Sequence, residues 1–225
     1  MKALILPDGF TGATDPGVAM WDQPPLVTLP LGGRPVLARE VDALSGLGIT
    51  QALVLAARHP HAIRAALQGV DECSWRLLYP GPDDTTGSLS RAWPLVEDSL
   101  LILDGQVGFS AHDIERAITV SQGADALRLC CLQTGAVALI LHGATLELLR
   151  SHTAQSLSDH LKACRRTGEL VVRELWTEGE PRRDIGFLLR EQTGRPATET
   201  VFTEARPGVW AVSYTHLTLP TSTHG

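Results

Sequence analysis

The chain has 225 residues, of which 44% are hydrophobic and 20% charged, which is typical of a globular protein of one domain or of one domain with a fragment of a second. Its net charge of −6 argues against a nucleic-acid partner, because phosphate backbones are bound by basic surfaces. It has no uncharged apolar run of about 18 residues, so no membrane span is predicted. The apolar stretch after Lys2 is too short for a signal peptide, and we expect a cytoplasmic protein.

Several classes of site have no support in the sequence. The chain lacks a Gly-x-Ser-x-Gly elbow, and none of its eight histidines shows metal-ligand spacing. The four cysteines also lack metal spacing, and we predict that they are buried, reduced thiols. They are Cys73, Cys130, Cys131 and Cys164.

The first part of the chain predicts a βαβ unit. Residues 1–6 (MKALIL) are expected to form a short buried strand, followed by a loop that contains Gly9 and Gly12. A helix is predicted from about residue 35 to 47, and a second strand over 51–57. Such a unit joins two parallel strands through a right-handed crossover.

The same alternation continues along the chain. Helices are predicted over residues 59–67, 87–94, 110–120, 144–150 and 157–166. Strands are predicted over residues 74–79, 99–103, 124–132, 135–141 and 169–176. The strands at 124–132 and 135–141 are expected to form a hairpin-like pair. Alternating strands and helices predict a mostly parallel sheet with helices on both faces.

The domain division places residues 1–176 in one domain and residues 177–212 in a poorly defined C-terminal segment. Residues 213–225 are interpreted as an artefactual tail, because SYTHLTLP looks like translated sequencing-adaptor text. On this interpretation the natural gene continues past about residue 212. The alternative is that the tail is a genuine C-terminus.

The N-terminal sequence resembles that of sugar-1-phosphate nucleotidyltransferases (NDP-sugar pyrophosphorylases). The matching stretches are Met1–Leu6 (MKALIL), Pro7–Gly12 (PDGFTG), Gln23–Leu26 (QPPL), Gly33–Leu37 (GRPVL) and Leu47–Ile49 (LGI). The resemblance covers residues 1–149. It implies a Rossmann-like three-layer α/β/α fold of the nucleotide-diphospho-sugar transferase type, with its site at the carboxyl ends of the strands.

In the resembling family, a sugar 1-phosphate attacks the α-phosphorus of a nucleoside triphosphate and releases pyrophosphate, with Mg²⁺ as cofactor. The resemblance therefore implies a nucleoside triphosphate and a sugar phosphate as partners. It also implies that Gly9 and Gly12 bind the nucleotide, since glycine lets a backbone approach phosphates closely.

The glycine loop departs from the family pattern in its charge. Gly9 and Gly12 are one residue further apart than in the family, and Gln23 replaces a lysine. Residues 7–33 contain no lysine or arginine but three aspartates. Such a loop is a poor binding site for a triphosphate, unless a metal ion compensates for the negative charge of the loop.

Two aspartates are candidate metal ligands, and Asp104 is also the candidate catalytic residue. Asp104 lies at the end of the 99–103 strand, but Gln106 stands where the family has its metal-binding aspartate. The alternative for Asp104 is a turn formed with Gly105. Asp184, in Arg183–Gly186 (RDIG), resembles part of a second metal-binding segment, and its alternative is a chance match.

A third stretch, Asp84–Leu89 (DTTGSL), resembles a family segment that lies against the nucleobase and sugar. It makes Gly87 and Ser88 candidate nucleotide-binding residues. The alternative is an ordinary helix start with Thr86 as N-cap.

Three functional hypotheses follow. The chain is a divergent nucleotidyltransferase of sugar-nucleotide or exopolysaccharide metabolism, or a degenerate relative that binds a sugar nucleotide or a partner without catalysis. The third hypothesis is a structural domain of a longer cell-envelope biosynthesis protein. The absence of the family's arginine, lysine and metal-binding aspartate favours the second and third hypotheses.

Overall fold

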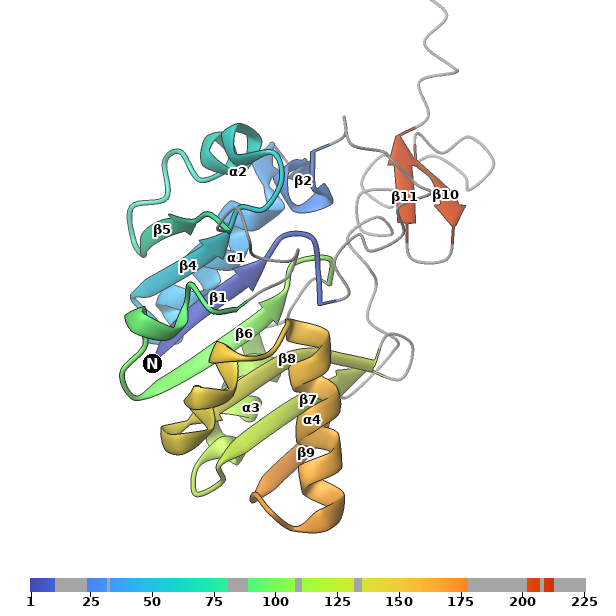
Figure 1. The fold of residues 1–225 in the computed structure, drawn as a ribbon. Coiled ribbons are helices and arrows are strands. Elements are labelled where there is room, and N and C mark those ends of the chain that lie inside the picture. Colours follow the sequence, from blue (N-terminus) through green and yellow to red (C-terminus); the bar gives the residue numbers. More distant parts are fainter. Residues whose placement is uncertain are drawn as a thin grey trace, which may run out of the picture.

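The computed structural model describes residues 1–10, 24–31, 33–80, 89–107, 111–131 and 135–177, and the backbone of 202–206 and 209–212 (Figure 1). Its main feature is a seven-stranded sheet with the order β5-β4-β1-β6-β8-β7-β9. These strands are β1 (Lys2–Leu6), β4 (Gln51–Leu55), β5 (Ser74–Leu78), β6 (Ser99–Asp104), β7 (Ala126–Cys131), β8 (Gly135–His142) and β9 (Val172–Trp176). Two separate antiparallel pairs are β2 (Pro30–Leu31) with β3 (Arg34–Pro35), and β10 (Phe202–Arg206) with β11 (Val209–Val212).

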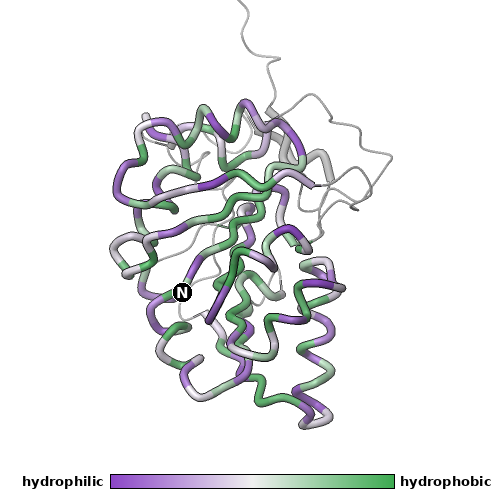
Figure 2. The backbone as a smooth tube through the Cα atoms, turned by 60° about the vertical axis from the view of Figure 1, so that its left-hand side comes forward, coloured by the Kyte–Doolittle hydropathy of each residue, from purple (hydrophilic) through white to green (hydrophobic). Residues whose placement is uncertain are grey.

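The sheet is mostly parallel, as the sequence predicts. Strand β8 runs antiparallel to both of its neighbours, β6 and β7, and every other pairing is parallel. The predicted hairpin-like pair is therefore confirmed as β7 and β8. Hydrophobic residues gather along the central strands (Figure 2), because strands covered on both faces bury nearly every side chain.

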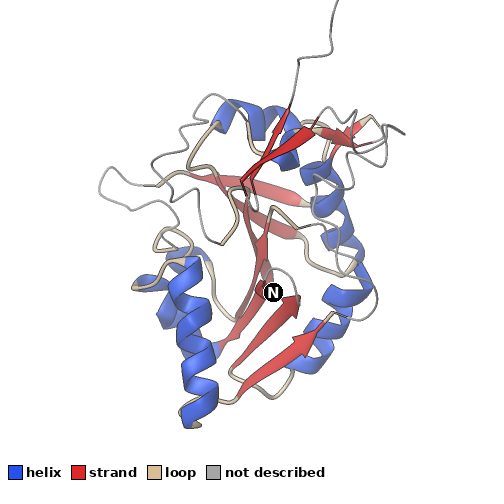
Figure 3. Cartoon of the chain, turned by 90° about the vertical axis from the view of Figure 1, so that its right-hand side faces the viewer, coloured by secondary structure: helices blue, strands red, loops and turns tan. Residues whose placement is uncertain are grey.

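Helices cover both faces of the sheet (Figure 3), which confirms the three-layer architecture. The helices are α1 (Val36–Gly46), α2 (Pro60–Ala66), α3 (Ala111–Ser121) and α4 (Ala154–Thr167), with the 3₁₀ helices η1 (Leu26–Thr28), η2 (Trp93–Leu95) and η3 (Gly143–Arg150). Buried residues of α1, α2 and α3 belong to one hydrophobic cluster, and those of η3 and α4 belong to another. No helix in the part of the chain that the structure describes is long and apolar enough to cross a bilayer.

Strand β1 lies between these two clusters and contributes to both. Ala3 and Ile5 pack on the α1 side, whereas Leu4 and Leu6 pack on the α4 side. This division follows from the alternation of side chains along a strand. The strand is thereby fixed on both faces, and its carboxyl end is held at a defined place on the edge of the sheet.

One predicted helix is wrong over its described part. Instead of an α-helix up to Pro94, residues 90–92 form a turn and Trp93–Leu95 a single 3₁₀ turn. Proline lacks an N–H and disfavours helical geometry in the residue before it, so Pro94 prevents a longer helix. The helix predicted over 144–150 is present, but as the 3₁₀ helix η3.

The chain order reverses between β1 and β6. From β1 the chain builds β4 and then β5 on one side, and it crosses back to place β6 on the other side. Leu6 and Asp104, the last residues of β1 and β6, are register partners. In open α/β sheets ligands bind in the crevice outside the carboxyl ends of the strands at such a reversal. The fold therefore points to the residues after Leu6 and around Asp104.

Candidate functional site

Asp104 joins the two loops that leave the sheet at the reversal. Its Oδ1 accepts a hydrogen bond from the backbone N–H of Gln106 at 2.8 Å, and its Oδ2 accepts one from the N–H of Phe10 at 3.1 Å. The first contact is the turn that an Asp-Gly pair favours, and the second reaches across to the loop after β1. Asp104 therefore has a structural role, whatever else it does.

The charge state of Asp104 is set mainly by its surroundings. Burial raises the pKa of the Asp104 carboxyl above its usual range, while the N–H groups of Gln106 and Phe10 oppose that shift. A carboxyl with a raised pKa at the carboxyl edge of a sheet is a common feature of functional sites, although structural networks produce such shifts as well.

Gly9 lies where a side chain would crowd the turn after β6. Its φ is +75°, and a Cβ atom added there would lie 2.9 Å from Asp104 Oδ1 and 3.1 Å from the Gln106 side chain. Gly105 is equally confined, since its Cβ would lie 2.6 Å from the carbonyl oxygen of Leu6. The same carbonyl accepts the N–H groups of Gly9 at 2.8 Å and Gly105 at 2.9 Å. The two loops thus meet backbone to backbone.

Gln106 also links the two loops. Its side-chain Nε2 donates to the backbone carbonyl of Asp8 at 3.1 Å. Gln106 is therefore used as a hydrogen-bond donor between the loops. This contact fixes the backbone of Asp8 next to the end of β6.

A cation reaches this site from β4. Arg58, three residues past the end of β4, donates from Nη2 to Asp8 Oδ1 at 2.7 Å. The two side chains are 23% and 13% exposed. Arg58 is not predicted as a site residue from the sequence, because it lies outside the loop after β1, where the resembling family has its cations. The available signal was topological: Arg58 follows the parallel strand next to β1, and their carboxyl ends must be neighbours.

No family model and no curated protein sequence matches the chain. Solved structures do match. Rv0371c from Mycobacterium tuberculosis H37Rv superposes with a TM-score of 0.61 at 16% identity, over 86% of this chain and 97% of that one. A further structure of Rv0371c is a complex with manganese.

Two other matches have names that state a ligand or an activity. HddC from Yersinia pseudotuberculosis, in complex with GMP-PN, has a TM-score of 0.61 at 14% identity, over 85% of this chain and 95% of that one. UDP-glucose pyrophosphorylase from Acinetobacter baumanii has a TM-score of 0.57 at 13% identity, over 80% and 86%. The chain has a nucleotidyltransferase-like fold. The fold expected from the sequence is confirmed, and at these identities the likeness establishes the fold alone.

The two described carboxylates at this edge, Asp104 and Asp8, already have partners. Mg²⁺ sites usually rest on one or two carboxylates. Both oxygens of Asp104 accept backbone N–H groups, and Asp8 is paired with Arg58. Across the described ranges no group of three or more His, Cys, Asp or Glu side chains could hold a metal ion. We therefore assign no catalytic step to a metal.

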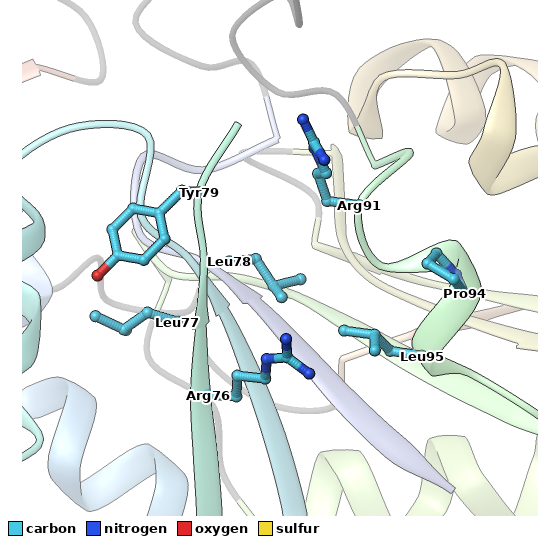
Figure 4. A pocket seen from close by; sticks show the side chains of 7 residues that line it. All are labelled: Arg76, Leu77, Leu78, Tyr79, Arg91, Pro94 and Leu95. Carbon is cyan, nitrogen blue, oxygen red and sulfur yellow. The ribbon is translucent and has the colours of Figure 1, made fainter. Parts of the chain in front are cut away.

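A hollow of about 310 Å³ lies elsewhere on the nucleotidyltransferase fold, at the edge strand β5 (Figure 4). It is lined by Arg76, Leu77, Leu78, Tyr79, Arg91, Pro94 and Leu95. Figure 4 shows β5 on one side and the η2 segment on the other. Strands β4 and β1 separate this hollow from β6 in the sheet order, so it is distinct from the site at Asp104.

Four candidate residues from the sequence, namely Gly12, Gly87, Ser88 and Asp184, lie outside the described residues. Of the candidates that the structure does describe, Gly9 and Asp104 come together at the carboxyl edge. The prediction that the cysteines are buried, reduced thiols is confirmed, because all four are buried and none is in a disulfide.

Proposed function

We propose that this chain is a divergent nucleotidyltransferase-like protein of sugar-nucleotide metabolism that binds nucleotide phosphates at the carboxyl ends of β1 and β6. The observation that carries this proposal is the position of Gly9 at the reversal of strand order. Ligands of open α/β sheets bind in the crevice at such a reversal, and the positive φ of Gly9 turns the loop after β1 at this place.

Two proteins with the same fold support this ligand class. HddC was solved with GMP-PN, and another match is a UDP-glucose pyrophosphorylase. We extend from them to this chain a nucleoside triphosphate as the ligand and a sugar 1-phosphate as the second substrate. In the transfer, a sugar-phosphate oxygen forms a bond to the α-phosphorus, and the bond to the β-phosphate oxygen breaks. Pyrophosphate leaves with the bonding electrons.

A second candidate function is nucleotide or sugar-nucleotide binding without turnover. The hydrogen bonds of Asp104 favour it. Its carboxylate links Phe10 to Gln106, and Gln106 supplies no charge where the family has a metal-binding aspartate. On this proposal the scaffold holds a nucleotide but does not accelerate its reaction.

One assay separates the two. The protein is incubated with each nucleoside triphosphate, a panel of sugar 1-phosphates and Mg²⁺, and pyrophosphate release is measured. Release with any combination supports the transferase, and its absence from every combination overturns it. Melting temperatures are recorded with the same nucleotides. A nucleotide-dependent rise without turnover selects the binding function, and the absence of both effects rejects nucleotide recognition.

A further inference from the structure

Arg58 supplies the positive charge that the loop after β1 lacks. Residues 7–33 contain three aspartates and no lysine or arginine. Strand β4 is the parallel neighbour of β1, and the chain that leaves its carboxyl end brings Arg58 against Asp8. The cation thus arrives from a residue 50 positions away in the sequence.

The guanidinium of Arg58 has a buried donor without a partner. Arginine carries five N–H donors in a fixed plane. In the described part of the structure, Nη2 of Arg58 donates to Asp8, while Nε is buried and has no hydrogen-bond partner. A buried, unsatisfied donor is uncommon in folded proteins, and strain, a functional role, or a bound water or ion explains it. The ion pair with Asp8 therefore leaves one N–H donor of Arg58, at Nε, without an acceptor in the described structure.

The backbone beside Arg58 is in an unfavourable conformation. His59 has a φ of +49° and is the only non-glycine residue with a positive φ in the described ranges. Such residues persist where the surrounding structure enforces them, and they cluster at ligand-binding sites. The left-handed turn at His59 directs the chain from the end of β4 into α2 and leaves Arg58 at the edge of the sheet.

We propose that Arg58 binds a phosphate of the nucleotide at this edge, and that Asp8 is an internal anion that occupies Arg58 until the phosphate displaces it. This inference rests on the proposed function. The ligand group is a di- or triphosphate, as in a nucleoside triphosphate or a nucleotide sugar. A guanidinium matches carboxylate and phosphate oxygens with the same planar donors, so Asp8 stands where a phosphate would bind.

The exchange makes opposite predictions for the two partners. Arg58→Gln removes the cation and should weaken nucleotide binding about tenfold or more, because one charge-assisted hydrogen bond is lost. Asp8→Asn removes the competing anion while it keeps the backbone carbonyl that Gln106 contacts. It should therefore tighten binding. If the pair were only structural, both changes would leave binding unaltered or weaken it together.

A matched pair elsewhere on the surface controls for charge. Glu147 and Arg150 form an exposed ion pair at 3.7 Å in η3. This helix begins where the N–H of Gly143 contacts the carbonyl of Asp98, just before β6, at the opposite end of the sheet. Glu147→Gln and Arg150→Gln repeat the charge changes of the test variants, and we expect them to leave affinity within about twofold of wild type.

The experiment is isothermal titration calorimetry on the full chain. The probe is the nucleoside triphosphate that gives the largest thermal shift with wild type, and inorganic pyrophosphate is titrated in parallel. Circular dichroism confirms that each variant is folded. If Arg58→Gln does not fold, Arg58→Lys replaces it, because lysine keeps the charge but loses the planar donors, and we expect intermediate affinity.

The outcomes separate the two proposals. Weaker binding by the Arg58 variant together with tighter binding by Asp8→Asn, for both probes, supports the exchange. If the Arg58 variant binds as tightly as wild type, or if Asp8→Asn weakens binding, this inference is overturned and the proposed function still stands. No binding of any nucleotide by wild type overturns both.

Discussion

Gly9 and Gly48 have nearly the same backbone angle, with φ of +75° and +76°, but very different surroundings. A Cβ on Gly9 would lie 2.9 Å from Asp104 Oδ1, whereas one on Gly48 would meet no atom within 4 Å. Alanine at either position carries the conformational cost of a left-handed residue, about 1–3 kcal/mol. Gly9→Ala should therefore lower the free energy of unfolding by more than Gly48→Ala.

The comparison is made by urea denaturation of the two variants and wild type. The difference between the variants measures the contact with Asp104, because the backbone term is common to both. Equal losses would mean that the loops at Gly9 and Asp104 are not packed as tightly as the structure has them.

Asp104 gives a prediction about pH. A carboxyl whose pKa is raised by folding binds more protons in the folded than in the unfolded chain. Its contribution to stability is fully present below its ordinary pKa of about 3.9, and it is lost as pH rises through the higher folded value. Asp104→Asn removes this titration.

The measurement is the free energy of unfolding of wild type and Asp104→Asn between about pH 4 and 8, the range above the ordinary carboxyl pKa. The wild-type value minus the variant value should be largest at the acid end and should fall as pH rises. A difference that grows with pH would show that hydrogen bonds to the carboxylate outweigh its burial.

At the scale of elements, one charged network joins β7, β9 and α4. Arg128, on β7, is 7% exposed and forms an ion pair with Glu174 of β9. Arg165 of α4 pairs with the other oxygen of Glu174, and Ser158 lies 3.4 Å from the Arg128 guanidinium. The network fixes β9 and α4 to β7.

Glu174→Gln should be strongly destabilising, because it leaves the buried Arg128 without its counter-charge. We expect a loss of about 3–5 kcal/mol, measured by chemical denaturation. Glu147→Gln, which breaks an exposed pair, should cost less than about 1 kcal/mol. A small loss for Glu174→Gln would mean that water or Ser158 compensates Arg128.

Burial, more than this network, keeps the Cys130 thiol protonated. Burial raises the pKa of the thiol to about 12, Arg128 opposes the shift, and Glu174 adds to it. The thiolate is the reactive form of cysteine, so this side chain fits the buried, reduced thiol that the sequence predicts.

At the scale of the whole molecule, the sequence predicts what depends on local patterns. The apolar runs locate all seven strands of the sheet. The signal is strongest for the central strands, which are covered on both faces, whereas β5 and β9 at the two edges are only partly buried. Gly9 and Asp104 are placed at one edge by the rule for parallel strands. The network around Arg128 and the pairing of Arg58 with Asp8 were not found, because these contacts join residues 46 and 50 positions apart.

The helix predicted up to Pro94 fails for a different reason. Its apolar spacing fits a helix, but the proline permits only a single 3₁₀ turn. A local backbone restriction thus overrides a favourable side-chain pattern.

The division of the chain leads to a final prediction. All seven strands of the main sheet lie before residue 177, and β10 pairs in the described structure with β11 alone. The backbone N–H of Thr177 donates to the carbonyl of Cys130 at 3.0 Å, so the hydrogen bonding of the sheet extends to residue 177. A chain of residues 1–177 should therefore fold by itself, with a melting temperature within about 4 °C of the full chain, the shift that about 1 kcal/mol produces at this size. Thermal unfolding followed by circular dichroism measures this shift.

Hydrogen exchange should show the slowest amides in β1 and β6, which lie within the sheet and face both hydrophobic clusters. An insoluble fragment, or one that melts far below the full chain, would mean that residues after 177 complete the core, and the domain boundary would then have to move toward the C-terminus.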